Sequence, residues 1–266
     1  MGTRPRGSKK KPERLSSTFE TINLEGGKVT ASIDYGADYD TNKPYELVIF
    51  ATPNGASSFS ESKLLERQSA TLRANHADKN IVIAYVSPNN GKWPNFLSAN
   101  PLNVNDINNA IRGQVEAATG ASPLGISFDA HSGGGSYIFN MINNFSEIPS
   151  SVASLNLYDC LYAYNGISHG QKIRNWLINN PSATLANITG TPQIAEKQAM
   201  LVSDLTSLGI QFSTLEQNPV SSTITALNGR IKLTTLSYFD HNGTVTRNGF
   251  LHAHTGGETP ITTRMA

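Results

Sequence analysis

Short, almost wholly apolar runs alternate along this chain with segments of helical length, and this alternation is the feature that most constrains its fold. Residues 46–51 (ELVIFA) and 80–86 (NIVIAYV) are apolar at nearly every position, which is typical of strands buried on both faces. Between them, residues 62–74 carry leucines at helical spacing. Strand–helix–strand units of this kind join parallel strands, so we predict an α/β protein with a mostly parallel central sheet and helices on both faces.

The same pattern extends through the rest of the chain. Residues 28–35 alternate between polar and apolar side chains, which predicts a half-exposed strand at the edge of the sheet. Further strands are predicted over residues 125–129, 154–158 and 231–236, and helices over residues 103–118, 136–145, 172–179 and 192–208. No internal repeat or Gly/Ser-rich linker divides these elements, so we expect residues 18–266 to form a single domain.

Composition excludes several classes of protein. Lys and Arg number 21 and Asp and Glu 20, so the net charge of +1 argues against a nucleic-acid partner. The only cysteine, Cys160, excludes an intramolecular disulfide and a Cys-based metal site, and we predict no metal and no cofactor. No run approaches the ~18 apolar residues that span a bilayer, so no integral membrane association is expected. Residues 1–17 are basic without the apolar stretch of a signal peptide, which predicts a flexible tail and leaves the compartment open.

The most informative segment for chemistry is residues 126–140, ISFDAHSGGGSYIFN. A predicted strand runs into His131, Ser132 and Gly133 and continues as a predicted helix. Small residues flank Ser132 two positions away on either side, which is the pattern of a nucleophile elbow, with alanine where glycine is commoner. Such a turn exposes the serine hydroxyl and aims the first N–H groups of the helix, beginning with Gly133, at a reacting oxygen.

A serine nucleophile needs a histidine base and an acid that orients it. Asp159 directly follows the predicted strand 154–158, at the edge where active-site residues emerge from a parallel sheet. Three histidines, His241, His252 and His254, come after the last predicted strand, and spacing alone does not choose among them.

Two further segments carry candidate binding residues. After the strand 46–51, a Pro-Asn-Gly turn can supply a second oxyanion donor from the N–H of Asn54 or Gly55. Trp93 follows the strand 80–86, where it can either line a substrate pocket or serve as a packing lid.

Several of these segments together resemble the α/β-hydrolase superfamily, and within it a group of uncharacterised bacterial proteins that look like serine hydrolases. The resemblance rests on the PNG turn at 53–55, KWP at 92–94, HSGGG at 131–135, YDCLYAYNG at 158–166, NWL at 175–177 and RNGFLHA at 247–253. It implies the α/β-hydrolase fold, with Ser132 as nucleophile, Asp159 as acid and His252, the histidine of NGFxH, as base. His254 and His241 remain as reserve candidates for the base.

The resulting hypothesis is a serine hydrolase with a Ser-His-Asp triad, an oxyanion hole and a small-molecule ester as substrate, an amide or peptide being less favoured. The alternative is a catalytically inactive binding or structural module that keeps the hydrolase fold. Geometry separates the two hypotheses, because catalysis requires one late histidine to lie between Ser132 and Asp159. The sequence does not indicate the acyl group or the oligomeric state.

Overall fold

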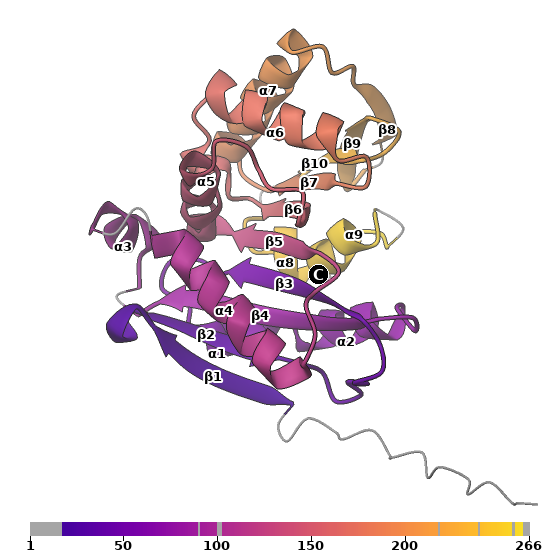
Figure 1. The fold of residues 1–266 in the computed structure, drawn as a ribbon. Helices are drawn as coiled ribbons and strands as arrows, with labels where there is room; N and C mark the ends of the chain where they lie inside the picture. Colours follow the sequence, from indigo (N-terminus) through magenta and orange to yellow (C-terminus); the bar gives the residue numbers. More distant parts are fainter. Residues whose placement is uncertain are drawn as a thin grey trace, which may run out of the picture.

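The computed structural model describes residues 18–89, 91–99, 103–217, 219–238, 240–256 and 259–262. The predicted basic tail at residues 1–17 lies outside this range. The described strands form one sheet of ten strands in the order β1-β2-β4-β3-β5-β6-β7-β10-β9-β8 (Figure 1). The strands are β1 (Phe19–Leu24), β2 (Val29–Asp34), β3 (Tyr45–Ala51), β4 (Asn80–Pro88), β5 (Ile126–His131), β6 (Val152–Tyr158), β7 (Thr184–Thr189), β8 (Ser213–Gln217), β9 (Ser221–Ala226) and β10 (Ile231–Leu236).

The centre of the sheet is parallel. Strands β4, β3, β5, β6, β7 and β10 pair in parallel, which confirms the predicted mostly parallel sheet. Antiparallel strands complete both sides, β1 and β2 beside β4 and β9 and β8 beside β10. Ala51 pairs with Ala130, and His131 pairs with Tyr158, so β3, β5 and β6 end side by side. The loops that follow these three strands therefore meet at one edge.

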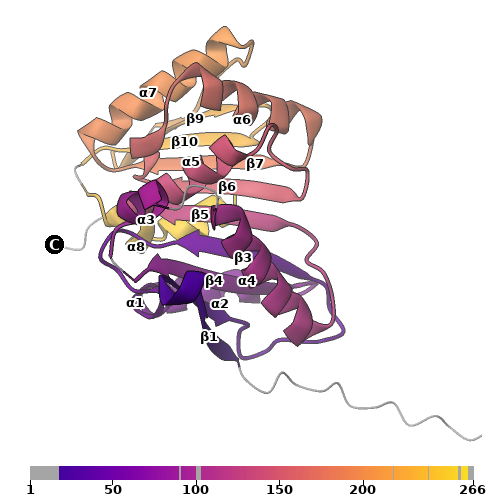
Figure 2. The same ribbon diagram turned by 60° about the vertical axis from the view of Figure 1, so that its left-hand side comes forward.

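Helices cover both faces of the sheet, as predicted. In Figure 2, α4 crosses in front of the strands while α1 and α2 lie behind them. One core contains residues of α4, α5, α6 and α7, and the other contains residues of α2, α8 and α9. No helix among the described residues is both long and apolar enough to cross a membrane. The helices are α1 (Ser58–Leu64), α2 (Glu66–Ala74), α3 (Trp93–Ala99), α4 (Asn103–Thr119), α5 (Gly135–Asn144), α6 (Ile167–Asn179), α7 (Pro192–Ser207), α8 (Gly243–Thr246) and α9 (Gly249–His254).

Local sequence signals account for where several helices begin. The Ser57 hydroxyl accepts the Ser60 N–H at 3.0 Å, and the Ser60 hydroxyl accepts the Ser57 N–H at 3.1 Å, which forms a reciprocal cap on α1. Pro192 opens α7, where its missing N–H is not needed. On α4, Ile107, Ile111 and Val115 are fully buried, as their spacing of four predicts.

The sheet extends further than the sequence predicts. Residues 28–35 were expected at the edge, but β2 is covered on its outer side by β1, and the prediction of an edge strand there is wrong. The predicted helix 62–74 is two helices, α1 and α2, that meet at Leu65. Strands β1, β7, β8 and β9 were not predicted.

Candidate active site

Ser132 lies at the sharp turn between β5 and α5. Its φ of 53° is in the left-handed region, which a residue with a side chain adopts at a cost of about 1–3 kcal/mol. The turn continues as a short 3-10 helix, Ser132–Gly134, and then as α5. This is the backbone geometry that the nucleophile-elbow pattern predicts.

The glycines after Ser132 are required by close backbone packing. A Cβ at Gly134 would overlap the carbonyl oxygen of Ala51 at the end of β3, and a Cβ at Gly135 would overlap that of Cys160, just after β6. A Cβ at Gly133 would overlap the side chain of Asn54. The three glycines therefore let the elbow pack directly against the ends of both neighbouring strands.

Gly135→Ala is expected to destabilise the protein by more than about 3 kcal/mol, because the added methyl overlaps a backbone carbonyl that no side-chain rotation can clear. The matched control is Gly113→Ala on the exposed face of α4, where a Cβ meets nothing within 4 Å. There the exchange should stabilise the protein by about 1 kcal/mol through helix propensity. Urea denaturation measures both, and equal stabilities for the two variants would contradict the packing of the elbow.

Asp159 pairs with His241. Its carboxylate is fully buried, and Oδ2 lies 2.5 Å from Nδ1 of His241, whose side chain is 29% exposed. Because a carboxylate only accepts, Nδ1 carries the proton and Nε2 is left to accept another. The other oxygen, Oδ1, accepts the N–H of Gly190 at 2.8 Å, the N–H of Thr191 at 3.1 Å and the Thr191 hydroxyl at 3.2 Å. These contacts fix the orientation of the carboxylate.

The loop that carries His241 is held on both sides. The Asp240 N–H donates to the Gly190 carbonyl at 2.9 Å, and the Asp240 carboxylate accepts the Gly243 N–H at 2.8 Å and pairs with Arg247 at 2.6 Å. The Thr244 hydroxyl donates to the His241 carbonyl at 2.7 Å. The hydrogen bonds and ion pair of this loop therefore position His241 together with its contact to Asp159.

His131, the residue before Ser132, contacts His241 directly. The two ring centroids lie 4.9 Å apart with the planes inclined by 33°. Nε2 of His131 lies 3.3 Å from the carbonyl oxygen of His241, so Nε2 donates and Nδ1 carries no proton in the neutral ring. Burial, and then the nearby His241, lower the pKa of His131 to about 4, so this ring is neutral at pH 7.

The low pKa of His131 predicts an acid-sensitive fold. Between pH 7.5 and pH 5 this histidine becomes protonated in the unfolded protein but stays mostly neutral in the folded protein, so the free energy of unfolding falls as pH falls. With unfolded and folded pKa values of 6.5 and about 4, this single group contributes a loss of about 2 kcal/mol over that range. His131→Gln should lose correspondingly less stability between the two pH values in urea titrations. An identical pH dependence in both proteins would contradict a buried neutral His131.

His252 does not pair with Asp159, which contacts His241 instead. The predicted pairing of Asp159 with His252 as the base is therefore wrong. It lies in α9, where its Nδ1 donates to the Thr259 carbonyl at 2.8 Å. Its Nε2 is buried with no partner among the described residues, and burial lowers the pKa of the ring. It faces a small cavity lined by Ile188, Lys232 and Thr234, so it packs against β7 and β10.

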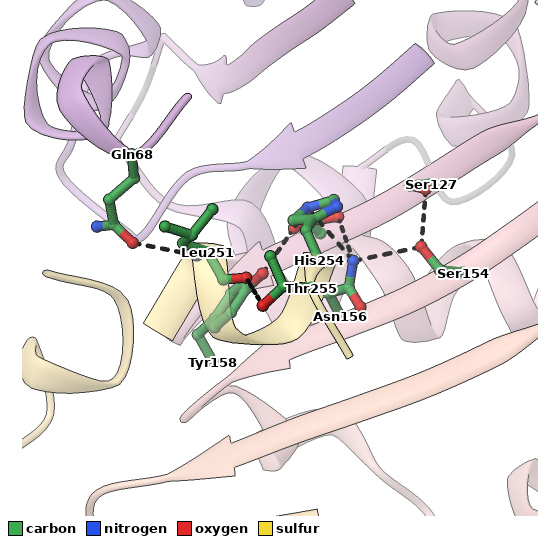
Figure 3. A network of polar contacts seen from close by, with 9 residues as sticks. Gln68, Ser127, Ser154, Asn156, Tyr158, Leu251, His254 and Thr255 are labelled. Carbon is green, nitrogen blue, oxygen red and sulfur yellow. Dashed lines mark hydrogen bonds and ion pairs between the residues drawn. The ribbon is translucent and has the colours of Figure 1, made fainter. Parts of the chain in front are cut away.

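His254, the other reserve histidine, belongs to a separate buried network on the α9 side of the sheet (Figure 3). Its Nε2 lies 2.9 Å from Oδ2 of Asp129, which also accepts the Tyr158 hydroxyl at 2.8 Å. The amide of Asn156 donates to Oδ1 of Asp129 at 3.0 Å. With Gln68, which accepts the Leu251 N–H at 3.1 Å, these contacts fasten α9 to the sheet and to α2.

The predicted oxyanion turn lies against the elbow, but one of its two candidate donors is engaged. The Gly55 N–H donates to the Gly91 carbonyl at 2.5 Å, so the prediction that it binds a substrate oxygen is wrong. The N–H of Asn54 has no acceptor among the described residues. The Asn54 side chain is oriented by the Trp93 N–H, which donates to its Oδ1 at 2.9 Å.

Trp93 does not line a pocket. It is fully buried, its ring lies 4.7 Å from that of Tyr137, and its indole N–H donates to the Thr52 carbonyl at 2.8 Å. The interpretation of Trp93 as a substrate-binding residue is therefore wrong. The Trp93 indole and backbone N–H together hold the turn at residues 53–55 in place.

The structure brings Ser132, Gly133, Asn54 and Asp159 to one edge of the sheet. The contacts made by His131, Gly190 and Thr191 were not predicted from the sequence. Gly190 and Thr191 follow the unpredicted strand β7, so no sequence signal led to them.

No protein-family model matches the sequence, and no curated protein matches it. Solved structures do. One is a mutant of the feruloyl esterase module from Clostridium thermocellum complexed with sinapinate. The alignment with it covers 93% of this chain and 90% of the esterase chain, at 13% identity and a TM-score of 0.54. With the siderophore hydrolase EstA from Aspergillus nidulans, 96% of this chain and 98% of the other align, at 10% identity and a TM-score of 0.52.

The chain has the α/β-hydrolase fold. It also aligns over 84% of its length with 58% of a thermostable esterase, at 14% identity and a TM-score of 0.48. Identities this low show the fold alone. Within its α/β-hydrolase fold, this chain places the elbow after β5 and Asp159 after the adjacent strand β6.

Proposed function

We propose that the protein is a serine hydrolase of carboxylic esters, with Ser132 as nucleophile, His241 as base and Asp159 as the acid that orients the base. The observation that carries the proposal is the 2.5 Å contact between Asp159 and His241, whose ring packs on the residue before an elbow serine. His241, a reserve candidate by sequence, replaces His252 in this role.

The chemistry follows from the protonation of His241. Its Nδ1 proton is held by Asp159, so Nε2 is free to take the proton of the Ser132 hydroxyl as Oγ attacks the ester carbonyl. The tetrahedral intermediate collapses, and the leaving alkoxide takes that proton from Nε2. Water then attacks the acyl-serine, again giving its proton to Nε2, and Ser132 recovers a proton as the carboxylic acid leaves. The buried Asp159 stabilises the imidazolium in both halves of the cycle.

The oxyanion hole is assigned to the N–H groups of Asn54 and Gly133. Gly133 lies in the first turn after the elbow, where N–H groups have no acceptor within the helix. The Asn54 side chain packs against Gly133, so the two loops adjoin. Removal of one such donor typically costs 10²–10³-fold in kcat.

The proposed substrate is a small ester. Two structures that share the fold are of a feruloyl esterase module and a siderophore hydrolase, which supports ester cleavage as the reaction class. A near-neutral chain of net charge +1 suits an uncharged substrate better than a polyanion.

Turnover of p-nitrophenyl acetate by the purified protein tests the proposal. We expect saturable hydrolysis that is abolished by one equivalent of a fluorophosphonate, because a single activated serine carries the reaction. Hydrolysis no faster than in buffer would favour the inactive module, and hydrolysis that survives the fluorophosphonate would exclude a serine mechanism.

A further inference from the structure

We infer that His131 is a positioning residue for the base: through its Nε2–H and its ring it fixes His241 relative to Ser132. The inference rests on the proposed function and extends it to a residue outside the triad. His131 is fixed to Ser132 by the peptide bond, and its side chain reaches the backbone of His241.

His241 is held at two points, its imidazole and its backbone carbonyl. Asp159 fixes the Nδ1 side of the imidazole, and His131 donates to the carbonyl of the same residue at 3.3 Å, beside the Thr244 hydroxyl, which donates to it at 2.7 Å. The two histidines are 110 positions apart in the chain, so the His131 side chain links the elbow directly to the distant loop that carries the base. A shift of about 1 Å between reacting groups can cost a hundredfold in rate.

The surroundings of His131 suit a fixed, uncharged support. Its side chain points to the α8–α9 side of β5, the side that Asp129 also faces, because residues two apart on a strand share a face. It is almost fully buried, and its Nδ1 has no partner among the described residues. A buried acceptor left unpaired is a stability cost that an apolar residue would avoid. A cationic ring here would oppose the imidazolium that His241 becomes during the reaction, and burial keeps His131 neutral at pH 7.

Three substitutions separate donor, ring and packing. His131→Phe keeps an aromatic ring beside His241 and removes the donor. His131→Gln places an amide N–H near the position of Nε2, and His131→Asn places it near that of Nδ1, where the His241 carbonyl is out of reach. Each variant is compared with wild type and Ser132→Ala for kcat and KM on p-nitrophenyl acetate, with the unfolding temperature measured alongside.

We expect His131→Phe and His131→Asn to lower kcat by roughly ten- to a hundredfold with KM within about twofold, and His131→Gln to restore kcat to within about fivefold of wild type. Unchanged kcat in the Phe variant, with Ser132→Ala inactive, would overturn the role of His131 and leave the proposed function standing. If kcat fell equally in all three variants and in step with their unfolding temperatures, His131 would act only through packing. That result would also overturn the inferred positioning role. Equal activity of wild type and Ser132→Ala would overturn the proposed function itself.

Discussion

His241→Ala is expected to lower kcat for p-nitrophenyl acetate by about 10⁴- to 10⁶-fold, the range found when the base of a serine triad is removed. The substitution removes the proposed acceptor of the Ser132 proton, while the three donors on Oδ1 keep the Asp159 carboxylate in its orientation. Stopped assays at high enzyme concentration measure the residual rate. KM should change little, because the imidazole acts mainly in the transition state.

His252→Ala is the matched control. His252 lies eleven positions after His241 in the same segment. Its side chain is hydrogen-bonded to the Thr259 carbonyl and not to Asp159. We expect kcat to stay within about tenfold of wild type, with a loss of about 1–3 kcal/mol in stability from the broken buried hydrogen bond. A large loss of kcat in His252→Ala beside a small one in His241→Ala would reverse the assignment of the base.

Asp159→Asn is expected to lower kcat by about 10⁴-fold, the effect of the same exchange in a serine protease triad. The three donors on Oδ1 require an oxygen there, so the amide NH2 must turn toward Nδ1 of His241. Nδ1 then has to accept, which moves the ring proton to Nε2, the atom that must receive the Ser132 proton. The backbone should tolerate the exchange, because asparagine adopts the φ of 46° found at this position.

Asp204→Asn provides the comparison for Asp159→Asn. Asp204 lies on α7 and accepts the Tyr164 hydroxyl at 2.7 Å, so this exchange alters a carboxylate that does not contact a histidine. Its kcat should remain within about twofold of wild type. If raising the pH to 9 restored Asp159→Asn to the wild-type rate, the tautomer argument would fail.

The positions of the turn at Ser132 and of Asp159 could be predicted from the sequence because each depends on local pattern. A strand, a serine flanked by small residues and a helix specify the turn at Ser132 over a few positions, and Asp159 directly follows an apolar strand. Parallel pairing then brings the ends of β5 and β6 together. These steps need no knowledge of the distant chain.

The base could not be chosen in this way. His241, His252 and His254 lie within 14 positions, and which of them faces Ser132 depends on how the segment after β10 crosses the sheet. The segment turns into the short helices α8 and α9, which carry His252 to β7 and His254 to Asp129. The resemblance selected His252, and tertiary packing places His241 beside the acid instead.

The missed strands have a similar explanation. The apolar pattern of strand β7 is interrupted by Asn187, a buried residue whose amide donates to Gln198 on α7 at 2.6 Å. Strand β8 is exposed along its whole length at the sheet edge, so it needs no apolar pattern. Buried hydrogen-bonded polar residues and exposed edge strands both lack the hydrophobic periodicity on which strand prediction depends.

Mapping the fluorophosphonate adduct on the wild-type protein tests the central claim most directly. Peptide mass spectrometry should find one modified residue, Ser132, with labelling strongly slowed in His241→Ala and nearly unchanged in His252→Ala, because His241 is the proposed base and is the histidine that pairs with Asp159. An adduct on another residue, no adduct on the folded protein, or equal labelling rates in wild type and His241→Ala would contradict the assignment of Ser132 and His241.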